Sequence, residues 1–292
     1  MKNSERKIDM NAEIIEKIRQ DELYYETTIA SIADRICNSN DIKIILIAGG
    51  SCAGKTTTTR KLSELISASG RNAHTVSLDD YYRNRDESVY LPDGTRDIES
   101  INSLRVDMIR DSMESLLAGK ETPIPMFDFK TSCRTDDYRR ITLNEGDVVL
   151  IEGLHALNLS LFKEAPPENE IFRIYLYADA GDGSDCRFVR RLVRDSRKRN
   201  ADAEHTYNLW DNVKSNEYVS IDPFRQYADV EINTFFPYER GILNDDAIKL
   251  LVDVDKDSVH YENARELIEI LAPVPQLSDD YIPENSLMYE FI

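Results

Sequence analysis

The distribution of apolar residues along the chain predicts buried strands that alternate with helices. A continuous apolar run at Lys43–Ala48 ends in glycines, as is typical of a strand buried inside a parallel sheet. Helical periodicity follows over Thr56–Ser69 and again over Asn102–Leu117. Further strands are expected at Ala73–Leu78, Val148–Ile151, Ile171–Tyr177 and near Ala228–Ile232. The pattern therefore predicts an α/β fold with a mostly parallel five-stranded sheet and helices on both faces.

The two ends of the chain differ from this central pattern. Residues 1–40 carry apolar side chains at helical spacing, which predicts a helical N-terminal extension. Residues 272–292 contain three prolines, and we expect them to be extended and packed along the surface. The chain is therefore expected to consist of a helical extension at 1–40, a central domain at 41–271 and a tail at 272–292.

Composition narrows the class of protein. With 292 residues, 41% of them hydrophobic, the chain can bury a full core. A net charge of −18 argues against general binding to nucleic acid or to anionic membranes. The apolar runs are far shorter than the roughly 18 residues of a membrane span, and the first residues do not form a signal peptide. The four cysteines show no paired spacing, which favours a reduced, cytoplasmic setting.

A phosphate-binding loop follows the first strand. The sequence GGSCAGKT fits the pattern G-x-x-x-x-G-K-[ST] at every position. Glycines let backbone N–H groups surround phosphate oxygens, Lys55 can bridge the β- and γ-phosphates, and the Thr56 hydroxyl can bind Mg²⁺. The predicted nucleotide-binding residues are Gly49, Gly50, Ser51, Cys52, Ala53, Gly54, Lys55, Thr56 and Thr57. The motif predicts a P-loop NTPase fold but does not by itself distinguish a kinase from other nucleotide-binding proteins.

Carboxylates follow two of the predicted strands. Asp79 and Asp80 lie at the end of the second strand, where a carboxylate could accept the proton of an attacking hydroxyl. Asp79 is the preferred catalytic base and a candidate metal ligand, with Asp80 as the alternative; either could instead be an ordinary turn or cap residue. Glu152 follows Val148–Ile151 in the manner of a Walker B strand, and we expect it to hold Mg²⁺ directly or through water.

A basic helix is expected between residues 187 and 199. Seven of these thirteen residues are arginine or lysine, with only Asp195 opposing them. Apolar residues at helical spacing supply a buried face: Phe188, Val189, Leu192 and Val193. In so acidic a chain, this concentration of positive charge indicates a lid helix that faces phosphate, although a solvated basic face would show the same pattern.

Taken in this order, the motifs resemble those of the uridine kinase family, the branch of P-loop kinases that also includes phosphoribulokinase. The resemblance extends from about Lys43 to Leu243. Besides the phosphate loop it rests on Ser77–Tyr82, Phe127–Phe129 with Arg134, Ile151–Gly153, Arg190–Arg199 and Tyr227–Val230. The chain is most similar to a bacterial subgroup of nucleoside-kinase-like proteins that often carry upstream domains similar to the N-terminal part of threonyl-tRNA synthetase.

The resemblance implies roles for individual residues. Asp79 matches the catalytic base, Thr56 and Glu152 match Mg²⁺ positions, and the residues expected to act in catalysis are Asp79, Lys55, Arg194 and Arg199. Arg194 and Arg199 match lid arginines that meet the triphosphate, and Arg191 matches one that reaches the ribose. Glu99 matches an aspartate that binds the ribose hydroxyls, and Phe127 an aromatic residue beside the base. The residues expected to contact the acceptor are Glu99, Phe127, Arg134, Arg191 and Tyr82.

The chain also departs from the family pattern on the acceptor side. Ser132 stands where uridine kinases carry a histidine that reads the pyrimidine edge, and Ala201 replaces a further arginine. The loop Arg83–Asp97 matches the pyrimidine enzymes poorly. We therefore expect uridine and cytidine to be poor acceptors.

The sequence thus predicts a kinase that transfers the γ-phosphate of Mg-ATP to a hydroxyl of a small molecule, with the 5′-OH of a nucleoside as the leading acceptor. Another sugar, a pentose phosphate or a vitamin precursor remains an alternative acceptor, and a nucleotide-binding regulatory protein without catalysis is a further alternative. A GTPase switch is disfavoured because no Asn-Lys-x-Asp motif occurs. The resemblance implies a homo-oligomer, a dimer or a tetramer.

Overall fold

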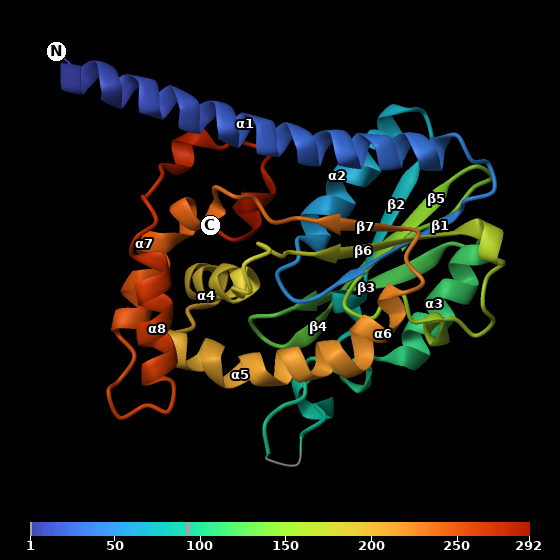
Figure 1. The fold of residues 1–292 in the computed structure, drawn as a ribbon. Helices are drawn as coiled ribbons and strands as arrows, with labels where there is room; N and C mark the ends of the chain where they lie inside the picture. The colour runs from blue at the N-terminus through green and yellow to red at the C-terminus, as the bar shows by residue number, and fades with distance from the viewer. Residues whose placement is uncertain (1, 92–93) are drawn as a thin grey trace. The chain divides into compact units, whose positions relative to one another are not determined.

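The predicted strands form one five-stranded sheet with the order β2-β5-β1-β6-β7 (Figure 1). The computed structural model describes residues 2–91 and 94–292, with side chains from residue 12 onward. The strands are β1 (Ile44–Gly49), β2 (Ala73–Ser77), β5 (Val148–Glu152), β6 (Ile171–Tyr177) and β7 (Val230–Asn233). Strand β1 pairs in parallel with β5 and β6, and β2 pairs in parallel with β5. The predicted α/β fold is confirmed.

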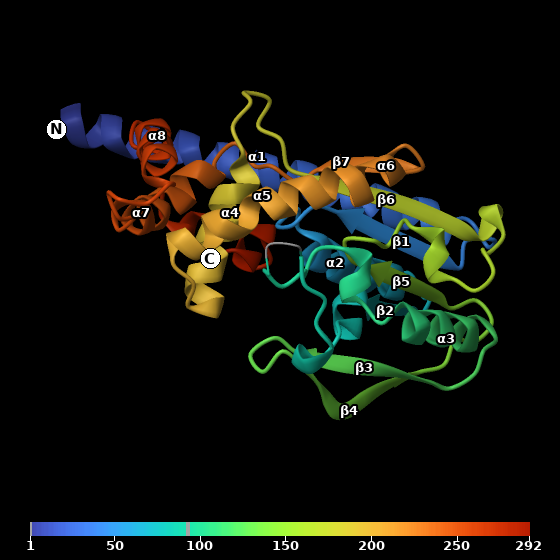
Figure 2. The ribbon, with the colours of Figure 1, turned by 90° about the horizontal axis from the view of Figure 1, so that it is seen from below.

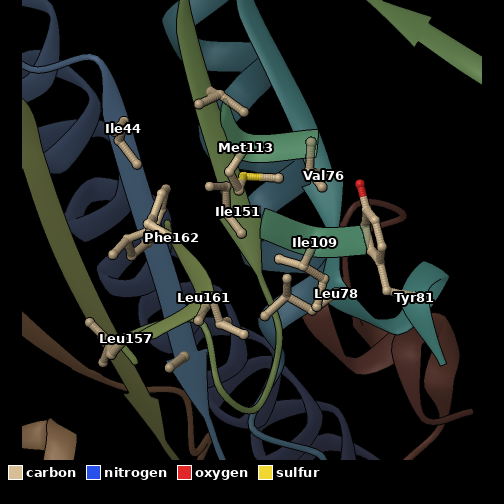
Figure 3. Close-up of a cluster of buried hydrophobic side chains, with 14 of the residues drawn as sticks. Ile44, Val76, Leu78, Tyr81, Ile109, Met113, Ile151, Leu157, Leu161 and Phe162 are labelled. Atoms are coloured by element: carbon tan, nitrogen blue, oxygen red, sulfur yellow. The ribbon is translucent and has the colours of Figure 1, made fainter. Parts of the chain in front are cut away.

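Helices cover both faces of this sheet. Helix α3 (Val106–Leu117) packs Ile109 and Met113 into an apolar cluster with alternate residues of the strands (Figure 3). That cluster includes Ile44, Val76 and Ile151. Neighbouring strand residues point to the opposite face, where helix α2 (Lys55–Ala68) contacts β1, β2 and β5. This face of the sheet is thus covered by a helix that begins at the phosphate loop.

A separate hairpin lies between α3 and β5 in the sequence. Strands β3 (Thr122–Asp128) and β4 (Cys133–Ile141) pair antiparallel, with a register shift between Pro125 and Phe127. Sequence periodicity did not predict this hairpin. The reason lies in β4, which is polar and mostly exposed and so lacks the apolar alternation of a half-buried strand.

The chain divides into two compact units. One comprises residues 30–177 and 212–232 and contains the sheet; the other comprises residues 1–29, 178–211 and 233–292. The second unit is helical, with α4 (Cys186–Arg199), most of α5 (Ala203–Asn216), α7 (Glu239–Val252) and α8 (Tyr261–Leu271). Helix α7 packs against both α4 and α8 (Figure 2). The expected boundaries at 40/41 and 271/272 stay predictions.

The N-terminal extension is one long helix, α1 (Lys2–Cys37), which contributes residues to both units. The short elements are Leu78–Tyr81, Arg85–Glu87, Ile101–Ser103, Leu159–Leu161, Glu168–Glu170, the π-helix η6 (Glu217–Ile221), α6 (Asp222–Arg225), Asp279–Tyr281 and Leu287–Glu290. Among the helices described, none is both long and apolar enough to cross a membrane.

The tail packs against the protein as expected, but its last residues are not extended throughout, because Leu287–Glu290 forms a 3₁₀ helix. Leu287, Met288 and Phe291 are fully buried. The guanidinium of Arg190 lies 4.7 Å from the centre of the Phe291 ring, and Lys198 donates hydrogen bonds to the carbonyls of Tyr289 and Glu290. The tail is held because it buries large apolar side chains and supplies acceptors to basic residues of α4.

Candidate active site

The phosphate loop runs from the end of β1 to the first turn of α2. A Cβ added at Gly49 would lie 2.2 Å from the carbonyl oxygen of Leu176 on β6, so only glycine allows this approach of the two strands. Gly54 adopts a left-handed conformation, with φ 81°, immediately before α2 begins. Because the first N–H groups of a helix have no partner within it, this end of α2 is suited to bind an anion.

The loop is held in a defined shape. Cys52 has a φ of 60°, a conformation that few residues other than glycine adopt, and its side chain is buried. The Lys55 ammonium donates a hydrogen bond to the carbonyl of Gly50, 3.0 Å away, so it lies across the mouth of its own loop. Thr56, at the second position of α2, is exposed. The shape of the loop therefore suits the binding of phosphate oxygens.

A hydrogen-bond network joins the ends of β2 and β5. Ser77 and Glu152 are partners in the sheet register, and the Ser77 hydroxyl donates to the Glu152 carboxylate. The same hydroxyl oxygen accepts the backbone N–H of Asp79 at 3.3 Å. The predicted metal ligand and the predicted base are thus connected through one serine.

The two neighbouring aspartates have different surroundings. The Asp80 carboxylate accepts the backbone N–H of Phe127 at 3.2 Å and so ties the hairpin to the end of β2. Burial raises the pKa of Asp80, and the Phe127 hydrogen bond offsets this only in part. Asp80 therefore has a structural contact that explains its presence, which supports the choice of Asp79 as the base.

His155 is a site residue that the motifs did not reveal. Its Nε2 lies 2.8 Å from the carbonyl oxygen of Glu99, and since a carbonyl only accepts, Nε2 carries the proton. Burial lowers the pKa of His155, while the hydrogen bond to Glu99 and the charge of Asp79 act in the opposite direction and Lys55 adds to the lowering. The lowered pKa favours the neutral imidazole, and the charges of both Asp79 and Lys55 act on this ring.

Three of the expected acceptor residues, Tyr82, Phe127 and Arg134, lie together in the sheet-containing unit, whereas Arg191 belongs to the other unit. The rings of Tyr82, Phe127 and Phe129 form a cluster with centroid separations of 5.1 to 5.9 Å. Arg134 pairs with Phe127 across the hairpin, and its Nη2 lies 3.6 Å from the Glu87 carboxylate. In the part of the chain that the structure describes, Nη1 of Arg134 is buried and has no hydrogen-bond partner. An aromatic surface therefore lies beside a buried cationic donor.

The backbone of Glu99 is fixed on both sides. Its N–H donates to the Asp97 carboxylate at 3.2 Å, and its carbonyl accepts hydrogen bonds from His155 and from the Asn216 amide, the latter at 2.7 Å. The Glu99 side chain starts from a firmly held position, as a substrate-binding residue requires.

The basic helix α4 belongs to the other unit, and it is less uniformly solvated than its charge indicates. Arg191, Arg194 and Arg199 converge on Asp195, which is only 2% exposed, at 3.3, 2.8 and 3.4 Å. The predicted lid arginines are thus arranged around a single carboxylate. The buried apolar face of α4 is confirmed, since Phe188, Val189, Leu192 and Val193 are all buried.

Two cations of α4 have structural partners that the sequence did not reveal. Arg190 is fully buried and forms hydrogen bonds to the Glu239 carboxylate and to Thr234. Arg197 pairs with Asp246. Asp195 is the one acidic residue within 187–199, and the further carboxylates that oppose these cations come from α7, about fifty residues later.

Comparison with known proteins identifies one family. A sequence model of the phosphoribulokinase / uridine kinase family matches residues 44–237. A uridine kinase of Deinococcus deserti is 28% identical over 209 residues, which cover 71% of this chain and 92% of that protein. Uridine-cytidine kinase 2-B of Danio rerio is 26% identical over 237 residues, covering 77% of this chain and 85% of that protein. The solved structure of a possible uridine kinase from Bacillus stearothermophilus is 18% identical, covers 69% of this chain and 97% of its own, and has a TM-score of 0.44.

Proposed function

Since the chain belongs to the phosphoribulokinase/uridine kinase family, as its motifs predict, we propose that it transfers the γ-phosphoryl group of ATP to the 5′-hydroxyl of a nucleoside. The observation that carries this proposal is the juxtaposition of a complete phosphate loop with two carboxylates at the ends of neighbouring strands. The Ser77 hydroxyl bonds to the Glu152 carboxylate and to the backbone N–H of Asp79, and Lys55, the first residue of α2, donates to the Gly50 carbonyl of the phosphate loop.

Each residue has a defined part in the transfer. The loop N–H groups and Lys55 bind the β- and γ-phosphates, and Asp79 accepts the proton of the acceptor hydroxyl as its oxygen attacks the γ-phosphorus. The bond between the γ-phosphorus and the bridging oxygen then breaks and ADP leaves. Arg194 and Arg199 neutralise the charge on the phosphates.

The donor set on this side of the site suits Mg²⁺. Thr56 supplies a hydroxyl and Glu152 a carboxylate, and both are the oxygen ligands that this ion prefers. Magnesium usually keeps several waters and binds through one or two protein ligands together with substrate phosphates, so these two residues suffice. When bound, the ion would offset the charge of the triphosphate.

The acceptor side supports a planar, hydroxyl-bearing molecule. The aromatic rings of Tyr82, Phe127 and Phe129 offer surfaces on which a base can pack. The buried Nη1 of Arg134 suits an acceptor oxygen, and Glu99 suits hydroxyl groups of a ribose. Arg191 is proposed to reach the same sugar. We further propose a homo-oligomeric, cytoplasmic enzyme whose partners are small molecules rather than nucleic acid or membrane.

The proposal is tested with a panel of purine and pyrimidine nucleosides, free pentoses and pentose phosphates, each offered with Mg-ATP and scored for acceptor-dependent ADP release. Lys55→Ala should abolish transfer while leaving the fold intact, because the hydrogen bond that the Lys55 ammonium donates goes to Gly50 within the phosphate loop and not to the core. Arg60→Ala, which removes an exposed cation from the same helix, is the matched control and should retain activity. Transfer that persists in Lys55→Ala, or no turnover with any member of the panel, would contradict the proposal.

The panel also tests the acceptor-side departures from the family. Because Ser132 stands where uridine kinases carry a histidine that reads the pyrimidine edge, we propose that uridine and cytidine are poor acceptors. Efficient turnover of uridine, with kcat/KM of about 10⁴ M⁻¹s⁻¹ or more, would overturn this expectation and leave the kinase proposal in place.

A further inference from the structure

Two consecutive residues at the junction of α5 and the π-helix η6 contact both sides of the candidate site. The Asn216 amide donates to the carbonyl of Glu99 at 2.7 Å. The Glu217 carboxylate accepts the backbone N–H of Ser51, in the phosphate loop, at 2.9 Å. Because neighbouring positions on a helix face directions about 100° apart, one short segment can hold two separate loops. All four residues belong to the same compact unit.

The contact with the phosphate loop is buried. Glu217 is only 5% exposed, and a carboxylate is unfavourable in such a position unless hydrogen bonds compensate it. The bond from Ser51 is a charge-assisted hydrogen bond, which is stronger than a neutral one. The segment is fixed at its other end by Ile221, which belongs to the apolar cluster beneath the sheet. A π-helix is rare and occurs frequently at functional sites.

On the acceptor side, the Asn216 amide donates to the carbonyl oxygen of Glu99, which also accepts a hydrogen bond from His155. His155 lies within electrostatic reach of Asp79 and Lys55, and its Nε2–H shares the Glu99 oxygen with Asn216. Three hydrogen bonds therefore connect the phosphate loop to the acceptor side through the consecutive residues Asn216 and Glu217. These are Ser51 to Glu217, Asn216 to Glu99, and Glu99 to His155.

We propose that Asn216 and Glu217 are positioning residues that couple the phosphate loop to the acceptor loop. A ligand that orders the phosphate loop also orders Glu99 and so raises the affinity for the acceptor. Because coupling between two sites is reciprocal, an acceptor that binds at Glu99 raises the affinity for the nucleotide by the same factor. The identity of the two ligands rests on the proposed function, whereas the coupling rests on the contacts described here.

Hydrogen exchange measured by mass spectrometry tests the coupling without any turnover. The probe is Mg²⁺ with the non-hydrolysable ATP analogue AMP-PNP, and the peptides followed cover residues 49–57 and 97–104. In the wild type, the analogue should slow exchange in both peptides by about fivefold or more. In Asn216→Asp, which replaces the amide donor with a carboxylate of equal size, protection should persist in 49–57 and disappear from 97–104. Ser215→Ala, an exposed neighbour on the same helix, is the matched control and should protect both.

The outcomes distinguish the two proposals. Protection of 49–57 but not of 97–104 in the wild type would overturn the coupling and leave nucleotide binding in place. Equal protection of both peptides in wild type and Asn216→Asp would also overturn it. Protection in neither peptide would contradict the proposed function itself, and the coupling with it.

Steady-state kinetics separate positioning from a merely structural role for Glu217. Glu217→Gln keeps an oxygen that can accept the Ser51 N–H, so kcat and both KM values should stay close to those of the wild type. Glu217→Ala removes the acceptor, and kcat/KM for both substrates should fall by about 10- to 100-fold while the thermal unfolding curve stays cooperative. Equal losses in Glu217→Gln and Glu217→Ala would contradict a role through the hydrogen bond.

Discussion

The choice between Asp79 and Asp80 as the catalytic base yields a sharp prediction. Asp79→Asn removes a proton acceptor at nearly constant volume and should lower kcat by about 10²- to 10⁴-fold, the usual range for a general base. That range corresponds to about 3 to 5 kcal/mol of activation free energy. The affinity for ATP should change little, because Asp79 lies at the end of β2 rather than in the phosphate loop.

Asp80 should behave differently because its carboxylate holds the backbone N–H of Phe127. Asp80→Asn keeps an oxygen for this hydrogen bond, so the change in unfolding free energy should stay within about 1 kcal/mol. Burial raises the pKa of Asp80, which means that the folded state binds protons more tightly than the unfolded state does. Above the unfolded pKa of 3.8, ionisation of Asp80 therefore lowers the free energy of unfolding. Asp80→Asn cannot ionise, so this loss is absent at neutral pH.

Asp80→Ala provides the structural contrast. It leaves the Phe127 N–H without its partner and should lower the unfolding free energy by about 1 to 3 kcal/mol. The assays are acceptor-dependent ADP release at saturating Mg-ATP, calorimetric titration with ATP, and urea unfolding. If Asp80→Asn lost most of kcat while Asp79→Asn remained active, the assignment of the base would be refuted.

Three further predictions concern stability. Asp195→Asn removes the carboxylate on which three arginines of α4 converge, so the unfolding free energy measured in urea should fall by about 3 to 5 kcal/mol. A change below about 1 kcal/mol would show that other groups pair with these arginines. Phe291→Ala should lower the unfolding free energy by about 3 to 5 kcal/mol, with Phe291→Leu milder; an unchanged urea midpoint would mean that the tail is not anchored as described. Burial raises the pKa of Asp147, but hydrogen bonds from Asn144, Asn72 and His74 outweigh it and bring the pKa to about 2. The stabilisation by Asp147 is therefore complete above pH 3.8 and lost as the pH falls toward 2, so wild type and Asp147→Asn should converge in stability over that interval and differ at pH 7.

Much of the sheet could be predicted from sequence because its strands are continuous apolar runs. The expected and observed bounds of β1, β2, β5 and β6 agree within two residues. The expected helix at Asn102–Leu117 begins later, at Val106, since Ser100 caps a separate short turn at Ile101–Ser103. Hydrophobic patterns in the sequence therefore predict the bounds of an element well when the element is buried along its whole length.

The site was predictable only where its residues lie in sequential motifs. The phosphate loop, Asp79 and Glu152 occupy such motifs, so their placement at strand ends followed from the alternation of strands and helices. The ion pairs of Asp195 with Arg191 and Arg199 could also have been predicted, because these residues are four positions apart on one helix.

The remaining site residues carried no comparable signal. Glu217 contacts Ser51 across 166 positions, and nothing in the local sequence indicates that partner. His155 could have been noticed as a polar residue within the apolar segment Leu154–Leu157, three residues after Glu152. Contacts of this kind are set by tertiary packing, which periodicity does not record.

The position of the acceptor-side residues in the chain has an evolutionary consequence. Tyr82, Glu99, Phe127 and Arg134 all lie between the end of β2 and the start of β5, which are neighbours in the sheet. Residues 78–147 connect two strands that are neighbours in the sheet. The length of this connection can therefore change at little entropic cost and without shifting the register of the strands that carry the phosphate loop. Recombination or grafting of this one contiguous stretch would therefore exchange most of the acceptor side, all but Arg191 of α4, while the phosphate loop is inherited unchanged.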